Sequence, residues 1–333
     1  MEVGTAFTDD GTAEATRIGC NLVQVPAVTS SWQGANAFES YAPVPTPIDQ
    51  TDVGGYVREH GSLPSATARV CVLSLADEPA SKTASEGAQL AAGQYAHFGF
   101  PGCDRSLGYL AATTAPSQLR QVIASFKSAK ATGVLFTGAP EGLLEAAIAD
   151  AQAVHFHPVW FLSAPGVTEQ LAIWSHAHFD PATRIVAAVE TQPFGATSNP
   201  SVAEYDHLVG SSQSALGEQA AAAFALFAQT ASSCGSSLTR QCLVNQLAAV
   251  HTAPGGLTTS ADPGSNLAGT CAFLVSLVKG TWVQTSPAAP GHASCSASYR
   301  HFTAVLMAWL HTNFGTVLTH RHLGTGAGDV VPR

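Results

Sequence analysis

Short apolar runs alternate with helical patterns between residue 66 and about residue 190. The apolar runs have the length and composition of buried strands: 68–75, 133–136, 157–162 and 184–189. The segments between them place apolar residues every three or four positions, as in helices: 81–96, 116–131, 142–153 and 167–175. In the second of these segments Leu119, Val122, Ile123 and Phe126 form one stripe. Alternation of strand and helix predicts βαβ units and a parallel sheet.

The remaining segments are less regular. Residues 21–25 predict one strand, and three prolines between 43 and 47 exclude regular structure there. Two further helices are expected at 210–230 and 238–250. The first would carry an apolar stripe of Leu216, Ala220, Phe224, Leu226 and Phe227. Segments 273–278 and 281–283 predict a hairpin around Lys279-Gly280.

Composition narrows the class of protein. The chain has 333 residues, with 14 basic and 23 acidic side chains and a formal net charge of −9, which excludes a basic nucleic-acid binder. This length suggests two domains. No apolar run reaches the roughly 20 residues that a membrane span needs, so we expect a chain that does not span a membrane. Residues 1–5 have neither the basic nor the apolar region of a signal peptide.

Seven cysteines are spread along the chain without a C-x-x-C pair: Cys20, Cys71, Cys103, Cys234, Cys242, Cys271 and Cys295. A zinc ribbon or thioredoxin-like site therefore has little support. The last four could form disulfides in an exported protein, and Cys271 with Cys295 is the preferred pair. An odd total leaves at least one free thiol, while Cys71, inside an apolar run, is expected to be a buried small hydrophobe.

Several strings, in their order and spacing, resemble the type I periplasmic binding proteins. The most similar group is the branched-chain amino-acid (Leu/Ile/Val) type of extracellular solute receptor for ABC transporters, in the form common in high-GC bacteria. The strings cover roughly residues 1–295: Phe7-Thr8-Asp9-Asp10-Gly11, Val25-Pro26-Ala27-Val28-Thr29, 68–75 with the helix after it, 132–144, and Gly255-Gly256-Leu257 with 271–283.

The resemblance implies an α/β fold of two doubly wound parallel-sheet lobes joined by crossover strands, with ligand held between the lobes. Residues 1–66 and 187–235 would form lobe one, and 67–186 and 236–295 lobe two. The crossings would fall near Ala66, Val189 and Ser236. Family members have about 100 residues of lobe one before the Phe7 string, so we expect lobe one to be incomplete and the chain to be N-terminally truncated.

The resemblance also implies ligand contacts. Thr8 falls where the family places a hydroxyl on the ligand carboxylate, and Ala27, Val28 and Thr29 fall where a small-residue turn presents backbone groups and a second hydroxyl. Ordinary loop roles remain the alternative for these residues.

Lobe two departs from the family at its contact positions. The family often has two aromatics and an acid where this sequence has Asp77, Ala139 and Pro165. Asp77 or Glu78 could replace the acid that pairs with the ammonium group of the ligand, although solvation at the surface is the expected role for either. The ligand would then differ from a branched-chain amino acid, or binding would have been lost.

A metal site is a competing interpretation. His155-Phe156-His157 and His176-Ala177-His178, the latter extending to Asp180, resemble the His-x-His-x-Asp-His string of zinc hydrolases with the metallo-β-lactamase fold. Pro181 replaces the final His, and that fold needs an antiparallel sandwich. We favour solvated histidines at a helix end.

Nucleophilic catalysis lacks its motifs. The sequence has no G-x-S-x-G elbow and no P-loop, and Gly324-Thr325-Gly326-Ala327-Gly328 lacks a preceding strand. The tail 296–333 does not resemble the family. It could form a helix lying on a membrane surface, form a terminal helix docked on the protein, or be sequence without a selected fold, and we favour the last two.

The leading hypothesis is therefore an extracytoplasmic solute-binding protein, not an enzyme. It would lie outside the cell or at its surface, use no cofactor, and deliver an amino acid or related polar solute to an ABC permease. The alternatives are a zinc-dependent hydrolase using 155–180 and a degenerate receptor-like module without ligand.

Overall fold

A predominantly parallel sheet organises the chain. The computed structural model describes residues 2–3, 19–27, 41, 43, 69–75, 105–107, 116–136, 141–162, 164–194, 198–259, 262–264, 271–286 and 291–295. The strands of the large sheet run in the order β10-β8-β7-β6-β5-β3-β4, with β9 also paired to β8. Their bounds are Val70–Leu75 (β3), Arg105–Leu107 (β4), Gly133–Phe136 (β5), Val159–Leu162 (β6), Arg184–Val189 (β7), Cys271–Val278 (β8), Thr281–Ser286 (β9) and Ser294–Cys295 (β10).

The strands β3 to β7 are mutually parallel. Residues of neighbouring strands lie in rows across the sheet. In one such row, Val134 of β5 lies opposite Trp160 of β6, which lies opposite Ile185 of β7. Parallel neighbours need crossover connections, and helices α6 (Pro116–Ser128), α7 (Glu141–Ala153) and α8 (Glu169–His178) supply them. The predicted α/β class with a mostly parallel sheet is confirmed.

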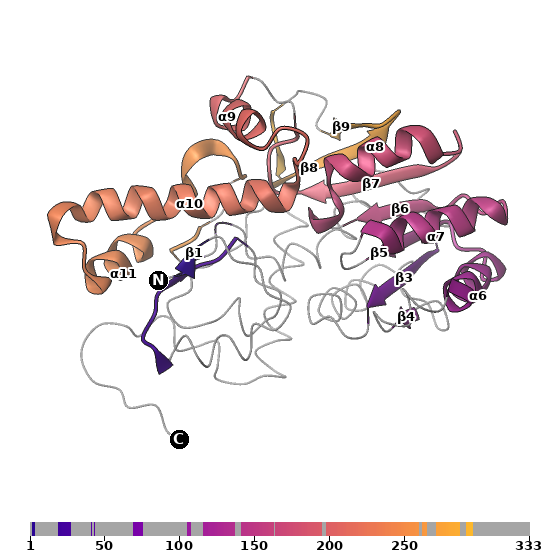
Figure 1. The fold of residues 1–333 in the computed structure, drawn as a ribbon, viewed down its shortest axis with the longest axis horizontal. Coiled ribbons are helices and arrows are strands. Elements are labelled where there is room, and N and C mark those ends of the chain that lie inside the picture. Colours follow the sequence, from indigo (N-terminus) through magenta and orange to yellow (C-terminus); the bar gives the residue numbers. More distant parts are fainter. Residues whose placement is uncertain are drawn as a thin grey trace.

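Both faces of this sheet are buried. Helices α6, α7 and α8 lie over one face of the sheet (Figure 1). They pack there against alternate side chains of the strands, including Leu73, Phe136 and Trp160. The intervening side chains, among them Leu135 and Phe161, form a second buried cluster on the opposite face. This two-sided burial explains why the central strands β3, β5, β6 and β7 appear in the sequence as apolar runs.

The antiparallel end of the sheet carries a disulfide. β8 and β9 form the predicted hairpin, with Lys279 and Gly280 both at positive φ in its turn. β10 lies beside the start of β8, with Cys295 opposite Cys271, and these two cysteines form the expected disulfide. Cys71 is fully buried, as expected, and it is also disulfide-bonded.

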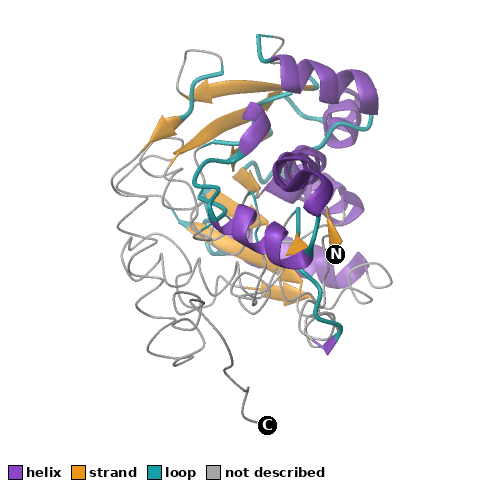
Figure 2. Cartoon of the chain, turned by 90° about the vertical axis from the view of Figure 1, so that its left-hand side faces the viewer, coloured by secondary structure: helices purple, strands orange, loops and turns teal. Residues whose placement is uncertain are grey.

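A second, smaller unit lies beside the sheet. It contains the parallel pair β1 (Glu2–Val3) and β2 (Gln24–Val25) with helices α9 (Pro200–Val209), α10 (Ala215–Cys234) and α11 (Arg240–Ala248). Figure 1 shows α10 as the long helix that runs from the β7–β8 side of the sheet to α11. Figure 2, turned by 90°, views this helix nearly along its axis. Val25, Leu226 and Leu247 belong to a separate hydrophobic cluster that joins β2, α10 and α11. This unit therefore has its own core.

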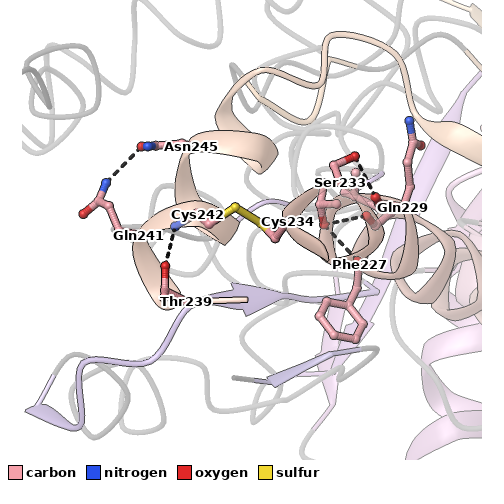
Figure 3. The surroundings of a disulfide bond; sticks show 10 residues. Phe227, Gln229, Ser233, Cys234, Thr239, Gln241, Cys242 and Asn245 are labelled. Atoms are coloured by element: carbon pink, nitrogen blue, oxygen red, sulfur yellow. Dashed lines mark hydrogen bonds between the residues drawn. A yellow bond between two sulfur atoms is a disulfide. The ribbon is translucent and has the colours of Figure 1, made fainter. Parts of the chain in front are cut away.

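Cys234 at the end of α10 forms a disulfide with Cys242 of α11 (Figure 3).

Three single-turn 3-10 segments complete the described elements: η1 (Ala164–Gly166), η2 (Gly235–Ser237) and η3 (Pro254–Gly256). Among the described residues Cys20 is a free, exposed thiol, in line with the odd cysteine count. None of the described helices is both long and apolar enough to cross a membrane.

The prediction that one apolar stripe forms the buried face of α10 is wrong. Phe224 is 63% exposed, and Leu216, Ala220 and Phe227 are only partly buried. The buried face instead follows a different line around the helix: Ala215, Glu218, Gln219, Ala222, Ala223, Leu226, Thr230 and Cys234. Helix α9 was not predicted. The predicted helix 81–96 and the tail 296–333 lie outside the described residues.

The core of the sheet should dominate stability. Phe126 of α6 is completely buried against the sheet, so Phe126→Ala should lower the free energy of unfolding by about 3–5 kcal/mol through lost burial and a cavity. The matched control, Phe224→Ala on the exposed side of α10, should change it by about 0.5 kcal/mol or less. Urea unfolding measures both. Equal losses for the two variants would contradict the packing.

Candidate functional site

Two segments of chain cross between the two units side by side. Residues 189–192 lead out of β7, and residues 257–259 lead back toward β8; we call these two segments the junction. Thr191 and Thr258 form an antiparallel bridge. The Gln192 N–H donates to the Leu257 carbonyl at 2.8 Å, and the Thr259 N–H donates to the Glu190 carbonyl at 2.7 Å. The Thr259 hydroxyl also donates to the Cys271 carbonyl at 2.9 Å, which ties the junction to β8.

The starts of α8 and α10 form a further tie between the units. The Glu169 N–H donates to the Gln213 carbonyl at 2.9 Å, and the Ala215 N–H donates to the Val167 carbonyl at 3.0 Å. Thr168 and Ser214 cap the two helices and accept hydrogen bonds from backbone N–H groups of the first turns. The carboxyl end of β6, followed by η1 and α8, is thereby held against the first turn of α10.

Helix α9 packs onto the same turn of α10. The Tyr205 hydroxyl donates to the Ser214 carbonyl and accepts from the Ser214 N–H, both at 3.2 Å. A Cβ atom at Gly217 would lie only 2.1 Å from that hydroxyl oxygen, so glycine is required for this approach. The Asn199 side chain caps α9 and donates to the Gly256 carbonyl at 2.6 Å, next to the junction. Tyr205 also lies close enough to act electrostatically on the residue that follows Gly217.

That residue, Glu218, is a completely buried acid. Neither carboxyl oxygen makes a hydrogen bond of good geometry, although the Thr191 hydroxyl of the junction lies close to it. Burial raises the pKa of Glu218 well above its ordinary value. The Asp206 carboxyl of α9 raises this pKa further, and the Thr191 hydroxyl lowers it in part. Removal from water favours the neutral form of a carboxyl group, so Glu218 holds its proton far more readily than a surface acid.

Other buried polar groups of the junction and of the first turn of α10 also lack hydrogen bonds. They are the hydroxyls of Thr191 and Thr258 and both amide atoms of Gln219. Buried polar atoms in folded proteins are nearly always paired with protein, water or ligand, because each unpaired atom costs about 1–3 kcal/mol. The junction and the first turn of α10 therefore form the candidate functional site.

Most of the sequence-predicted contact residues lie outside the described residues: Thr8, Val28, Thr29, Asp77 and Ala139. Ala27 follows β2 and is buried. Pro165 lies in η1, directly after β6, at the carboxyl end of the parallel sheet. The structure therefore places Pro165 on the segment that leads to the α8–α10 tie.

Glu218 was missed by the sequence analysis. The sequence pattern that could have revealed it is a spacing of three or four residues, which marks one face of a helix. On α10 this face contains residues 215, 218, 219, 222, 223 and 226. An acid and an amide on that face would have indicated a buried polar site. The abundance of alanine on every side of α10 concealed the pattern.

The histidine pairs do not have the geometry that the zinc hypothesis requires. His176 and His178 lie in the last turn of α8, where residues two positions apart point in different directions. Both are exposed, and His178 Nδ1 lies 2.8 Å from the Trp174 carbonyl. His155 and His157 are also exposed. Within the described ranges no three His, Cys, Asp or Glu side chains are grouped to hold a metal ion.

Comparison with known proteins identifies the fold. No protein-family model matches the sequence, and no curated protein matches it. Solved structures do match. A leucine-binding protein from Thermotoga maritima has a TM-score of 0.61 and 13% identity, covering 89% of this chain and 78% of its own. An ABC transporter substrate-binding protein from Desulfitobacterium hafniense in complex with Leu has a TM-score of 0.60 and 11% identity, covering 85% and 79%.

A third match is a solute-binding protein of an ABC transporter from R. palustris in complex with benzoate. Its TM-score is 0.61 at 14% identity, and the match covers 89% of this chain and 78% of the neighbour. The fold is thus that of type I periplasmic binding proteins, as the sequence resemblance implies.

Replacement of Glu218 should change how stability depends on pH. Its pKa is raised on folding, so the folded state binds the proton more tightly than the unfolded state, and wild-type stability falls as pH rises from the unfolded pKa to the folded pKa. Glu218→Gln should remove this loss, so the stability of the variant relative to wild type should rise with pH between about pH 5 and about pH 8. Urea unfolding across this range measures it.

The control is Glu204→Gln, the same change at an exposed acid of α9. Its unfolding curve should follow wild type at each pH. A Glu218→Gln variant whose stability relative to wild type does not change with pH would show that Glu218 titrates as a surface acid does.

Proposed function

We propose that this chain is an extracytoplasmic solute-binding protein that captures a small polar molecule between two lobes for an ABC importer. The observation that carries this proposal is the junction: two paired segments join two separately packed units, and buried polar groups without partners gather beside it. In open α/β sheets, ligands bind outside the carboxyl ends of the strands, and β6 and β7 both end here. Binding without chemical conversion is the activity that this arrangement supports.

The proposed lobe boundaries are supported by the packing. We assign 1–66 to lobe one and 67–186 to lobe two, with the second crossing at 189–192. The cluster that contains Leu247 joins α11 to β2, so we place the third crossing at 257–259 instead of near Ser236. Lobe one then includes residues 193–256, and 260–295 complete lobe two. Hinge closure would bend the chain at these crossings.

The proposed ligand is an amino acid or a related small polar solute. Structural neighbours are described as binding leucine and benzoate, two small carboxylates. The contact residues proposed from the sequence are Thr8, Ala27, Val28 and Thr29 of lobe one and Asp77, Ala139 and Pro165 of lobe two. A permease is the proposed partner, and the proposed location is outside the cell or at its surface.

Ligand-induced stabilisation tests the proposal. A ligand that binds only the folded chain, present at about a hundred times its Kd, adds about 2.7 kcal/mol of stability. Thermal unfolding of the full chain with each of the common L-amino acids and with benzoate should therefore raise the Tm for at least one compound. Thr29→Ala should reduce that rise while leaving the Tm without ligand close to wild type. A panel in which no compound moves the Tm would contradict the proposal.

A further inference from the structure

We infer that the contact of residues 167–169 with residues 213–215 is a proton-dependent latch between the two packed units. The latch is closed while the acids beside it, Glu169, Asp206 and Glu218, hold protons, and it loosens as they ionise. Acidic surroundings would hold the units in the described arrangement, and alkaline surroundings would loosen it. The inference concerns a contact within the chain and needs no bound solute, so it goes beyond the proposed function and is tested separately from it.

The latch is a short backbone contact between the units. Thr168 and Ser214 form an antiparallel bridge, whose two hydrogen bonds are donated by the N–H groups of Glu169 and Ala215. The Trp282 indole N–H donates to the Thr168 carbonyl at 2.8 Å, which fixes this side of the latch to β9. The other side is the start of α10. Because a backbone hydrogen bond adds only modestly to net stability, a change of charge beside these two bonds can open the contact.

Three acids from three helices lie around Ser214, at the centre of the latch. The Glu169 N–H of α8 is bonded across the latch to the residue before Ser214. Asp206 of α9 follows Tyr205, whose hydroxyl is hydrogen-bonded to both backbone groups of Ser214. Glu218 lies one turn of α10 further on, and its N–H donates to the Ser214 carbonyl at 3.0 Å. The closed latch therefore brings acids of both units together.

These acids act on one another across the boundary between the units. Burial raises the pKa of Glu169, and the Asp206 carboxyl raises it further. Burial also raises the pKa of Glu218, which has no exposed surface, and the same Asp206 carboxyl adds to this rise. Asp206 of α9 thus couples the acid of α8 to the acid of α10.

The described cations of the neighbouring elements lie away from the latch. His176 and the Lys279 carbonyl meet at the last turn of α8, at the opposite end of that helix. Arg240 begins α11, beyond the opposite end of α10, and His207 of α9 is exposed. None of these cations is among the groups that shift the pKa of either raised acid.

The other titratable groups beside the latch are acidic or neutral. Glu190 follows β7 and is buried. Burial raises the pKa of Tyr205, and the carboxyls of Glu218 and Asp206 add to the rise. The 3-10 segments η1 and η3 have no titratable side chains. Ionisation at the latch therefore adds negative charge where the neighbouring groups oppose it.

Closure of the latch is linked to the binding of protons. In the closed latch the pKa values of Glu169 and Glu218 are raised, whereas water that enters on opening returns them toward the ordinary value of a glutamate. The closed form thus binds protons more tightly than the open form. Its stability is fully present below the ordinary pKa and is lost as pH rises through the raised pKa, when opening releases the protons to solvent.

Amide hydrogen exchange of the full chain without ligand, followed residue by residue by NMR, tests the latch. The probes are the N–H groups of Glu169 and Ala215, which are the two donors of the latch, and the amides of β6 inside the sheet are the reference. After division by the intrinsic exchange rate at each pH, exchange of the two latch amides should rise from about pH 5 to about pH 8. The latch amides should also exchange faster than those of β6 at each pH, because the latch opens locally while β6 needs global unfolding.

Variants assign the effect to the acids. Asp206→Asn and Glu218→Gln should each reduce the rise of exchange with pH, and the double variant should lose most of it. The matched control is Glu204→Gln at an exposed acid of α9, which should keep the wild-type rise. If Glu218→Gln does not fold, Asp206→Asn at its half-buried position provides the test against the same control.

Three results would overturn the latch. The first is corrected exchange at Glu169 and Ala215 that stays constant with pH in wild type. The second is exchange of these amides as slow as that of β6, since the contact would then open only when the whole chain unfolds. The third is a rise with pH that Asp206→Asn keeps in full or that Glu204→Gln reduces equally. No solute is present in this experiment, so each of these results leaves the proposed function to its own test.

Discussion

The pairing of residues 189–192 with residues 257–259 is the constraint on which the rest of the structure depends. Two backbone hydrogen bonds form the antiparallel bridge between Thr191 and Thr258 and hold these segments together at the place where the chain leaves the large sheet and returns to it. The sheet with α6, α7 and α8 forms one core, and β2 with α10 and α11 forms another. The two cores meet at the start of α10, where Ala215 packs with the core of the sheet. Bending at the junction would therefore act at this contact as well as at the paired segments.

The junction is also where polar groups are buried. Helix α10 begins there, held by its Ser214 cap and by Tyr205, and it carries Glu218 and Gln219 into the interior on its first turn. Unpaired buried polar groups reduce stability, and natural proteins commonly accept such a cost at functional sites. A ligand that supplies the missing partners would convert this cost into binding energy and would favour the arrangement in which both units contact it.

The central strands β3, β5, β6 and β7 were predictable from sequence because they are short, mostly apolar and followed by periodic helices. The short strands β4 and β10, which contain Arg and Ser residues, were not predicted. β5 at Gly133–Phe136 and the buried stripe of α6 match the predictions residue by residue. The prediction failed for α10, where alanines on all sides removed the contrast between faces and Phe224 was taken for a core residue. The pairing of Thr191 with Thr258 joins segments 67 residues apart. Glu218 becomes a candidate only when that long-range contact and the packing of α9 are known.

The relative motion of the two units tests the account most directly. Spin labels would be attached at Val154, directly after α7, and at Leu238, between α10 and α11, which are exposed and lie on different units. Cys20, a free thiol, is first replaced by serine so that it does not take up a label. Pulsed electron resonance then measures the distance between the two labels with and without a compound that raises the Tm. The account predicts that the bound compound shifts and narrows the distribution of distances. An identical distribution with the compound bound would contradict closure at the junction.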